Sequence, residues 1–118
     1  MVELTLTDEQ ARIVSRACEF YARIVMGQFK EIIWDCINIR PGDKDDVYQR
    51  RDEADRLLFE ARKQIYPELH GPGHSYGIGK FERADKAFDV HQVIRYAMGH
   101  WRTPFSYHEL PKCVYRKE

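Results

Sequence analysis

The chain lacks an excess of charge of either sign, since its 118 residues carry 19 basic and 19 acidic side chains. A protein that coats nucleic acid needs a basic surplus, and a mimic of nucleic acid needs an acidic one. We therefore expect no extended nucleic-acid track. Glycine and proline are also scarce, with seven and five residues, which excludes a collagen-like or low-complexity chain.

Targeting signals and long hydrophobic runs are missing as well. Residues 1–12 contain no basic start followed by an apolar stretch, so they do not resemble a signal peptide. The longest apolar stretch is interrupted by Arg23, Gln28, Lys30 and Glu31, and it is far shorter than a membrane span. These features favour a cytoplasmic protein without membrane contact.

Cysteine is rare too, and Cys18, Cys36 and Cys113 form no C-x-x-C pair. Three widely spaced cysteines indicate reduced thiols rather than a disulfide framework. Because Cys18 and Cys36 fall on one apolar helical stripe, we predict that both are unreactive core thiols.

Apolar residues recur with helical periodicity in three segments of the chain, and this pattern predicts an all-α fold in one domain of residues 1–118. A first helix begins at a capping box, Thr7 with Gln10, and runs from residue 8 to about Asn38. A second helix runs from about Asp46 to Tyr66, and Pro67 ends it. The apolar seam of this second helix, which we expect to be buried, consists of Val47, Ala54, Leu57, Leu58, Ala61 and Ile65.

A third helix is predicted from Phe81 or Glu82 to about Trp101, with Pro104 beyond its end. His91 falls on its apolar seam, where a hydrogen-bonded core histidine is expected rather than a ligand or a base. The following residues, 105–118, are rich in aromatics and predict an extended arm. Val2, Leu4 and Leu6 alternate with polar residues, so a short strand that pairs with this arm remains an open alternative.

The first helix is too long for a compact globule of this size. At about 1.5 Å per residue it measures ~46 Å, against a diameter of roughly 35 Å. Either the helix breaks near Met26-Gly27, or it projects into a partner subunit. It also carries two adjacent apolar stripes. We therefore predict a homo-oligomer, dimeric or higher, through the first helix, with Phe20, Ile24 or Phe29 near the interface.

The Gly-rich loop before the third helix is the most unusual segment, with four glycines within residues 68–80. Glycine lets backbone N–H groups approach a ligand, and a helix N-terminus favours an anion. However, the loop matches neither G-x-x-x-x-G-K-[ST] nor G-x-G-x-x-G. A simple connection between antiparallel helices, in which glycines adopt positive φ angles, is the alternative.

The histidines do not form a metal-binding pattern. His70 and His74 are four residues apart, but they lie in a Gly/Pro loop, whereas such a pair needs a helix to bind a metal. We therefore predict no metal and no cofactor. The paired carboxylates Asp45-Asp46 and Asp52-Glu53 lie among arginines, which is typical of a solvated surface.

Cations alternate with aromatics at the end of the third helix, a pattern that suits phosphate pairing together with base stacking. From residue 71 onward there are eight Lys/Arg and five Asp/Glu, a local charge of +3. This charge fits one small anionic ligand, although aromatic residues that merely seal the core are an alternative. The candidate ligand-binding residues are His74, Ser75, Tyr76, Gly77, Gly79, Lys80, Arg83, Arg95, Trp101 and Arg102.

Several segments together resemble small proteins of unknown function encoded by phages and prophages of Gram-positive bacteria. These are the E-L-T-L-T start, G-Q-F-K-E-I, P-E-L, S-Y-G-I-G and A-F-D-V-H-Q-V-I-R-Y-A. The most specific part is Tyr76-Gly77-Ile78-Gly79 followed by Asp89, Gln92, Val93 and Arg95. The resemblance is weakest at residues 39–50 and in the tail, and it implies an accessory factor with no catalytic residue to carry over. By analogy of context alone, some unrelated small phage proteins are oligomeric sponges for nucleotide signals of bacterial immunity.

These observations predict a non-enzymatic protein, because no Ser-His-Asp or Cys-His arrangement can be derived from the sequence. We expect it to bind, and to sequester, a small nucleotide-like anion as a counter-defence sponge. One alternative is a protein-interaction module that inhibits a host protein through the first helix or the aromatic arm. Another is a small hydrolase or lyase, for which no nucleophile can be named.

Overall fold

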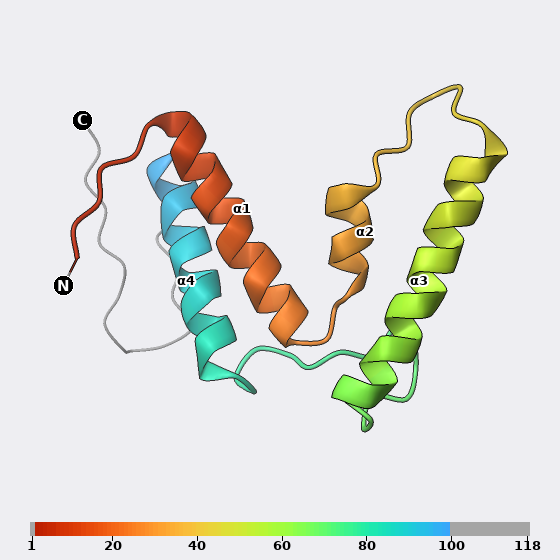
Figure 1. Cartoon of the computed structure of the whole chain (residues 1–118). Helices are drawn as coiled ribbons and strands as arrows, with labels where there is room; N and C mark the ends of the chain where they lie inside the picture. The colour runs from red at the N-terminus through yellow and green to blue at the C-terminus, as the bar shows by residue number, and fades with distance from the viewer. Residues whose placement is uncertain (1, 100–118) are drawn as a thin grey trace.

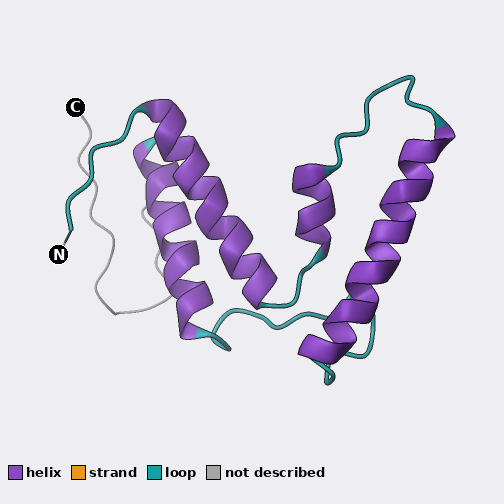
Figure 2. Cartoon of the chain, in the orientation of Figure 1, coloured by secondary structure: helices purple, strands orange, loops and turns teal. Residues whose placement is uncertain are grey.

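A computed structural model describes residues 2–99 and confirms the all-α class. Its helices are α1 (Asp8–Val25), α2 (Lys30–Cys36), α3 (Asp45–Ile65) and α4 (Glu82–Ala97), and residues 2–99 contain no strand. Figure 1 shows α1 beside α4 and α2 beside α3. The connections 26–29 and 66–81 both lie at the lower end of the view in Figure 2. The predicted arm of residues 105–118, and with it the proposed strand pairing, lies outside the described residues.

The predicted capping box starts α1. Thr7 Oγ1 accepts a hydrogen bond from the Gln10 backbone N–H at 3.2 Å, and Gln10 Oε1 accepts one from the Thr7 N–H at 3.0 Å. Two backbone donors that the helix leaves unsatisfied are thereby paired. Asp8 and Glu9 in the first turn add charge of the sign that the positive end of the helix dipole favours.

The predicted first helix of residues 8–38 is divided in two at the glycine that follows α1. Gly27 has a φ of +91°, a left-handed conformation that an α-helix cannot contain. Its N–H donates to Ile24 O at 3.0 Å, and the Gln28 N–H donates to Arg23 O at 2.9 Å. This is the Schellman pattern of helix termination. The chain therefore takes the first of the two predicted alternatives, and no helix has to project into a partner on grounds of length.

The core lies mainly between α1 and α4. Ala22, Val25 and Met26 pack with Ala84 and Phe88, and the half-buried Tyr76, Phe81 and Ala87 lie against this cluster. The apolar spacing of the third helix predicts a seam of Ala84, Ala87, Phe88, His91, Ile94, Met98 and Trp101. Ala84, Phe88 and His91 are buried, Ala87, Ile94 and Met98 are half-buried, and Trp101 lies outside the described residues. The helix ends earlier than predicted, at Ala97 rather than near Trp101, and Gly99 follows with a φ of +81°.

The apolar seam predicted to be buried on the second helix is largely exposed. Leu57 is 53% exposed and Ile65 is 58% exposed, and Ala61 is also exposed. Within the described residues α3 packs against α2, which has 7 residues against the 21 of α3. A partner this short cannot cover the whole stripe, so the prediction of burial is wrong for Leu57, Ala61 and Ile65, whereas Val47, Ala54 and Leu58 are half-buried.

The two described cysteines also differ from the prediction. Cys18 is half-buried, whereas Cys36 is exposed, so the prediction of a core thiol is wrong for Cys36. The reason is that α2 ends at this residue, after the break at Gly27 has redirected the stripe.

The arrangement is more open than that of a compact chain. The Cα radius of gyration is 16.9 Å, compared with about 13 to 14 Å for a compact domain of this length. No helix within residues 2–99 is both long enough and apolar enough to cross a membrane.

Candidate functional site

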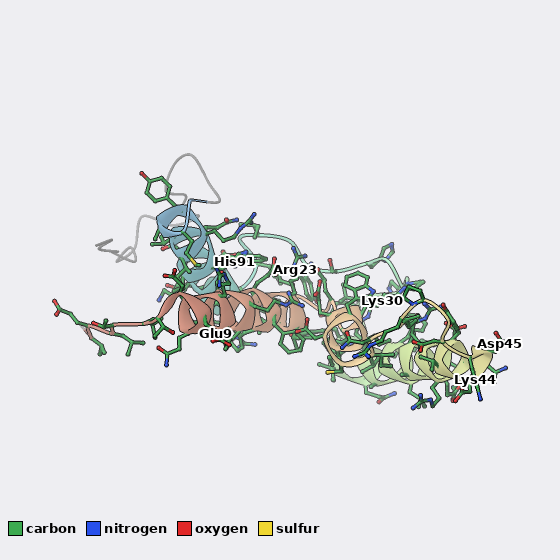
Figure 3. The ribbon with its side chains drawn as sticks, turned by 90° about the horizontal axis from the view of Figure 1, so that it is seen from above. Glu9, Arg23, Lys30, Lys44, Asp45 and His91 are labelled. Carbon is green, nitrogen blue, oxygen red and sulfur yellow. The ribbon has the colours of Figure 1, made fainter. Side chains whose placement is uncertain are left out.

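A pocket of about 410 Å³ lies where the Gly-rich loop crosses α1 and α4. We call it the polar pocket. Three elements and the residue after the Gly27 turn supply its walls, and Figure 3 shows Arg23 of α1 and His91 of α4 next to each other. The lining residues are Glu19, Arg23 and Met26 of α1, Gln28, residues 75–78 of the loop, and Phe88, His91, Gln92 and Arg95 of α4.

Backbone hydrogen bonds and aromatic contacts fix the Gly-rich loop against the end of α1. The Tyr76 N–H donates to Met26 O at 2.8 Å, and the Tyr66 hydroxyl donates to Val25 O at 2.6 Å. The Tyr76 ring packs edge-on against Tyr66 and Phe81, with centroids 5.4 Å and 5.2 Å apart. These contacts hold the 75–78 segment against the end of α1, but they also occupy much of the Tyr76 ring that was predicted to stack on a ligand.

Arg62 of α3 anchors the Gly-rich loop through hydrogen bonds. It is only 4% exposed, and its guanidinium donates to the carbonyls of Gly27 at 3.3 Å, of His74 at 2.6 Å and of Gly71. Its Nε is buried without a hydrogen-bond partner. One arginine therefore connects the α1–α2 turn at Gly27 to the first part of the Gly-rich loop, at Gly71 and His74.

His91 is the buried hydrogen-bonded histidine that the sequence predicts. Its Nδ1 lies 2.7 Å from Ser15 Oγ and 3.0 Å from Ser15 O, and its Nε2 lies 3.5 Å from Glu19 Oε2. Burial lowers the pKa of His91 below its ordinary value, although the Glu19 carboxylate acts in the opposite direction. Arg95 and Arg23 lower the pKa further, so the neutral imidazole is favoured.

The Ser15, His91 and Glu19 contact has the composition of a hydrolase triad, but it does not have the accessibility of one. Ser15 is 6% exposed, lies inside α1 and is not among the residues that line the polar pocket. A nucleophile must reach a substrate carbonyl. The arrangement therefore serves to satisfy the buried polar groups between α1 and α4.

A second set of charges joins α1 to α2. Arg16 contacts Glu31 at 2.9 Å and Asp35 at 2.5 Å, and Arg23 lies 3.6 Å from Glu31. Arg23 also lies 3.5 Å from Glu19. Burial acts to raise the pKa of Glu19, but the hydrogen bond from Arg16 and the electrostatic interactions with His91 and Arg23 outweigh it, and the pKa is lowered. The positive charge of Arg23 is thus largely matched within the protein.

Four of the residues predicted from the sequence meet in the polar pocket: Ser75, Tyr76, Gly77 and Arg95. His74 lines a different cavity, described below. Lys80 and Arg83 line neither cavity, since Lys80 Nζ lies over the Tyr76 ring at 5.3 Å and the Arg83 guanidinium lies over Phe81 at 5.5 Å. Trp101 and Arg102 lie outside the described residues.

Gly79 does not present its backbone to the polar pocket. Its N–H donates to the Asp85 carboxylate, at 3.0 Å and 3.2 Å from the two oxygens, and its φ is +95°. Asp85 is 1% exposed, so a buried carboxylate of α4 takes the donor that was predicted to cradle an anion. At this position the loop follows the alternative prediction of a connection that needs positive φ.

Sequence reasoning missed Glu19, Arg23, Gln28, His91 and Gln92 as pocket residues. From the sequence, Glu19 and Arg23 belong to the polar face of the first helix, together with Arg12, Arg16 and Lys30. The buried Gln92 has a side-chain oxygen, Oε1, without a hydrogen-bond partner. The available signal was the spacing of Arg16, Glu19 and Arg23, which places alternating charges on one face of the helix, where they can form ion pairs with one another.

A second cavity of about 540 Å³ lies between α2, α3 and loop residues 72–75. Its walls include Phe29, Trp34 and Phe59, and we call it the aromatic cleft. Gln28 and Ser75 line both cavities. Within residues 2–99 no group of three or more His, Cys, Asp or Glu side chains is placed to hold a metal ion.

Comparisons of the chain with protein-family models, with curated proteins and with solved structures found no match. Function must therefore be argued from the geometry of the two cavities and from the exposed faces of the helices.

Proposed function

We propose that the chain binds a small, anionic, nucleotide-like ligand in the polar pocket. The observation that carries this proposal is the meeting of the Gly-rich loop with Arg95 and the buried Gln92. An arginine offers a planar set of donors that matches a phosphate or carboxylate. The Gln92 oxygen without a partner suits an N–H group of the same ligand.

The polar pocket is lined by charges of both signs, Glu19, Arg23 and Arg95. Glu19 and Arg23 lie 3.5 Å apart on α1, so an anion near them meets a carboxylate as well as a guanidinium. Arg95 lies on α4 and lines the same pocket as Ser75 and Gly77. The proposal therefore assigns the anionic group to Arg95, with the loop backbone at Ser75 and Gly77 next to it.

We propose that the protein binds its ligand without transforming it. Ser75 is the aliphatic hydroxyl that lines the polar pocket, and within residues 2–99 it forms no hydrogen bond with Glu19 or His91, which line the same pocket. In the cytoplasm of a phage-infected host, tight binding alone sequesters a nucleotide signal. This role rests on the resemblance to phage-encoded proteins and on analogy of context.

Replacing Arg95 with alanine is expected to weaken nucleotide binding about ten- to a hundred-fold. The loss of a charge-assisted contact costs roughly 1.5 to 3 kcal/mol, which corresponds to that change in affinity. Calorimetric titration with linear and cyclic nucleotides measures it. Arg83→Ala is the matched control, because Arg83 is an exposed arginine of the same helix that lines neither cavity. Equal binding by wild type and Arg95→Ala contradicts the site, and no binding by wild type at tens of micromolar contradicts the ligand class.

We further propose that the chain forms a homo-oligomer through an outer face of α1, made of Ile13, Ala17 and Tyr21. These residues lie at i, i+4 and i+8 on one side of the helix, all three are exposed, and Ile13 is 62% exposed. An apolar stripe of this kind is typical of a helix that packs against a partner. The predicted contacts Phe20, Ile24 and Phe29 are half-buried within the chain, so they are at most its margin.

Ile13→Glu is expected to convert the oligomer to a species of 14.1 kDa, the mass of one chain, because it buries a charge in an apolar interface. Sedimentation at micromolar concentration measures the mass. Leu57→Glu, on the exposed seam of α3, is the matched control and is expected to leave the oligomer intact. Dissociation by Leu57→Glu alone moves the interface to α3, and a wild type that sediments at 14.1 kDa contradicts self-association.

An inhibitor of a host protein is the second candidate function. The exposed apolar residues of α1 and α3 favour it as well, since a monomer with such faces is suited to bind a heterologous partner. It becomes the leading proposal if the wild type is monomeric and binds no nucleotide.

A further inference from the structure

The two cavities are neighbours, and this arrangement suggests a ligand with two parts. Gln28 and Ser75 line both the polar pocket and the aromatic cleft. We propose that the aromatic cleft binds the nucleobase of the ligand whose anionic group is held at Arg95. This inference rests on the proposed function, which it extends by a second subsite and by a requirement for a planar ring.

The aromatic side chains in the wall of the cleft favour a ligand with a planar ring. Trp34 of α2 is 65% exposed, although it is one of the largest apolar side chains in the chain. It lines the cleft together with Phe29, which precedes α2, and Phe59 of α3. Phe29 and Phe59 are half-buried, and Arg62 and Lys63 lie over the Phe59 ring at 5.4 Å and 4.7 Å. The exposed Trp34 is therefore the ring that we expect to stack on the base.

Polar groups at the cleft wall match the edge of a base rather than a purely apolar ring. Asp52 and Asp55 lie three residues apart on α3 and both line the cleft. Asp55 also contacts Lys30 at 3.6 Å. A carboxylate accepts hydrogen bonds and donates none when ionised. The cleft therefore favours a base whose edge carries ring N–H or amino donors, as guanine does.

The shared wall is held in place, so the two subsites keep their separation. Arg23 Nη1 donates to Gln28 Oε1 at 2.9 Å. On the loop side, Arg62 Nη1 donates at 2.6 Å to the carbonyl of His74, the residue before Ser75. A ligand that reaches both cavities passes between Gln28 and Ser75, which is the place for the sugar of a nucleotide.

The volumes of the two cavities agree with this division. Each cavity, at about 410 Å³ and 540 Å³, falls in the range of small-molecule sites. The charges of the aromatic cleft are mixed, since the cations Lys30, Arg56 and Arg62 line it together with Asp52 and Asp55. These three cations outnumber the two carboxylates, so the aromatic side chains, and not the charge of the cleft, assign the base to it.

The test compares Trp34→Ala with Arg95→Ala by calorimetric titration of the full chain. The probes are guanosine 5′-monophosphate, adenosine 5′-monophosphate, guanosine and inorganic pyrophosphate. Trp34→Ala is expected to weaken both nucleotides and the nucleoside roughly five- to a hundred-fold, because one stacking contact is lost, and to leave pyrophosphate binding unchanged. Arg95→Ala is expected to weaken the nucleotides and pyrophosphate alike. Tyr48→Ala removes an exposed aromatic of α3 that lines neither cavity, and it is expected to bind as the wild type does.

The outcomes separate this inference from the function on which it rests. Nucleotide binding that needs Arg95 but is equal in Trp34→Ala and wild type overturns the nucleobase subsite and leaves the proposed function standing. Weakening of pyrophosphate by Trp34→Ala to the same extent as of the nucleotides also overturns it, since Trp34 then acts on the fold. If the wild type binds neither nucleotide, the proposed function fails and the subsite fails with it. Because Trp34 is largely exposed, its replacement leaves the core intact, and unchanged circular dichroism checks this.

Discussion

Replacing Arg62 with methionine is expected to lower the free energy of unfolding by about 3 kcal/mol. The guanidinium donates to three backbone carbonyls, those of Gly27, Gly71 and His74, and the side chain is 4% exposed. Methionine fills a similar volume but donates no hydrogen bond, so these carbonyls lose a charged donor. A hydrogen bond to a charged group is worth about 1.5 to 3 kcal/mol, and a buried group left unpaired adds its own cost. Urea denaturation followed by circular dichroism measures the change.

Arg56→Met is the matched control for this experiment. Arg56 lies six residues earlier on α3, is exposed, and forms an ion pair with Glu53 at 2.5 Å. Exposed pairs of this type contribute at most about 1 kcal/mol. A loss for Arg62→Met no larger than for Arg56→Met means that Arg62 does not hold the loop as the structure implies. In that case the walls shared by the polar pocket and the aromatic cleft are not fixed either.

Arg62 also illustrates what a periodic pattern cannot reveal. The sequence places it among the charged residues of α3, and from spacing alone it has the same solvated environment as Arg56. Its burial follows from the approach of two distant segments, the turn at Gly27 and the loop at residues 71–74. Apolar periodicity reports which side of a helix avoids water, but it does not report which loop reaches the other side.

A comparison of the apolar seams of α3 and α4 shows which part of the fold could be predicted from the sequence. Both seams have helical spacing, yet Phe88 and His91 of α4 are buried, whereas Leu57 and Ile65 of α3 are largely exposed. The difference lies in the partners. The 16 residues of α4 face the 18 residues of α1, whereas α3 faces the 7 residues of α2. The helices themselves could be predicted from local signals such as the capping box at Thr7. How much of each helix is buried by its neighbours could not be predicted in this way.

The candidate site was predictable to a similar degree. Loop composition and the sequence of α4 were sufficient to single out Tyr76, Gly77 and Arg95, which line one pocket. Gly79 was assigned to the same cradle on composition, but its N–H is bonded to Asp85. The acceptor lies six residues further along the chain, within the next helix, and a glycine pattern does not indicate which side the N–H faces. Single glycines therefore need the structure to decide between a ligand and a cap.

Replacing Gly27 with alanine is expected to lower the free energy of unfolding by about 2 to 3 kcal/mol. At a φ of +91°, a residue with a Cβ is strained by roughly 1 to 2 kcal/mol. The added Cβ also comes within 2.7 Å of Leu69 Cδ1, and Leu69 is buried, so its side chain has to move. The same substitution favours a continuous helix through residues 26–29, which would displace Gln28 from the wall between the two cavities. Thermal and urea unfolding measure the stability loss, and calorimetry with nucleotide measures the effect on the site.

Two other glycines separate the causes of this effect. Gly79→Ala introduces the same kind of strain, with a φ of +95° but no atom within 4 Å of the new Cβ, and is expected to cost about 1 to 2 kcal/mol. Gly73→Ala introduces neither strain nor contact and is expected to change stability by less than about 0.5 kcal/mol, with a gain possible because the unfolded chain loses freedom. We therefore expect the loss of stability to decrease in the order Gly27, Gly79, Gly73. The positive φ angle strains the first two positions, and the contact with Leu69 at 2.7 Å affects Gly27 alone among the three. Equal stability of Gly27→Ala and Gly73→Ala contradicts the Schellman turn as the feature that ends α1.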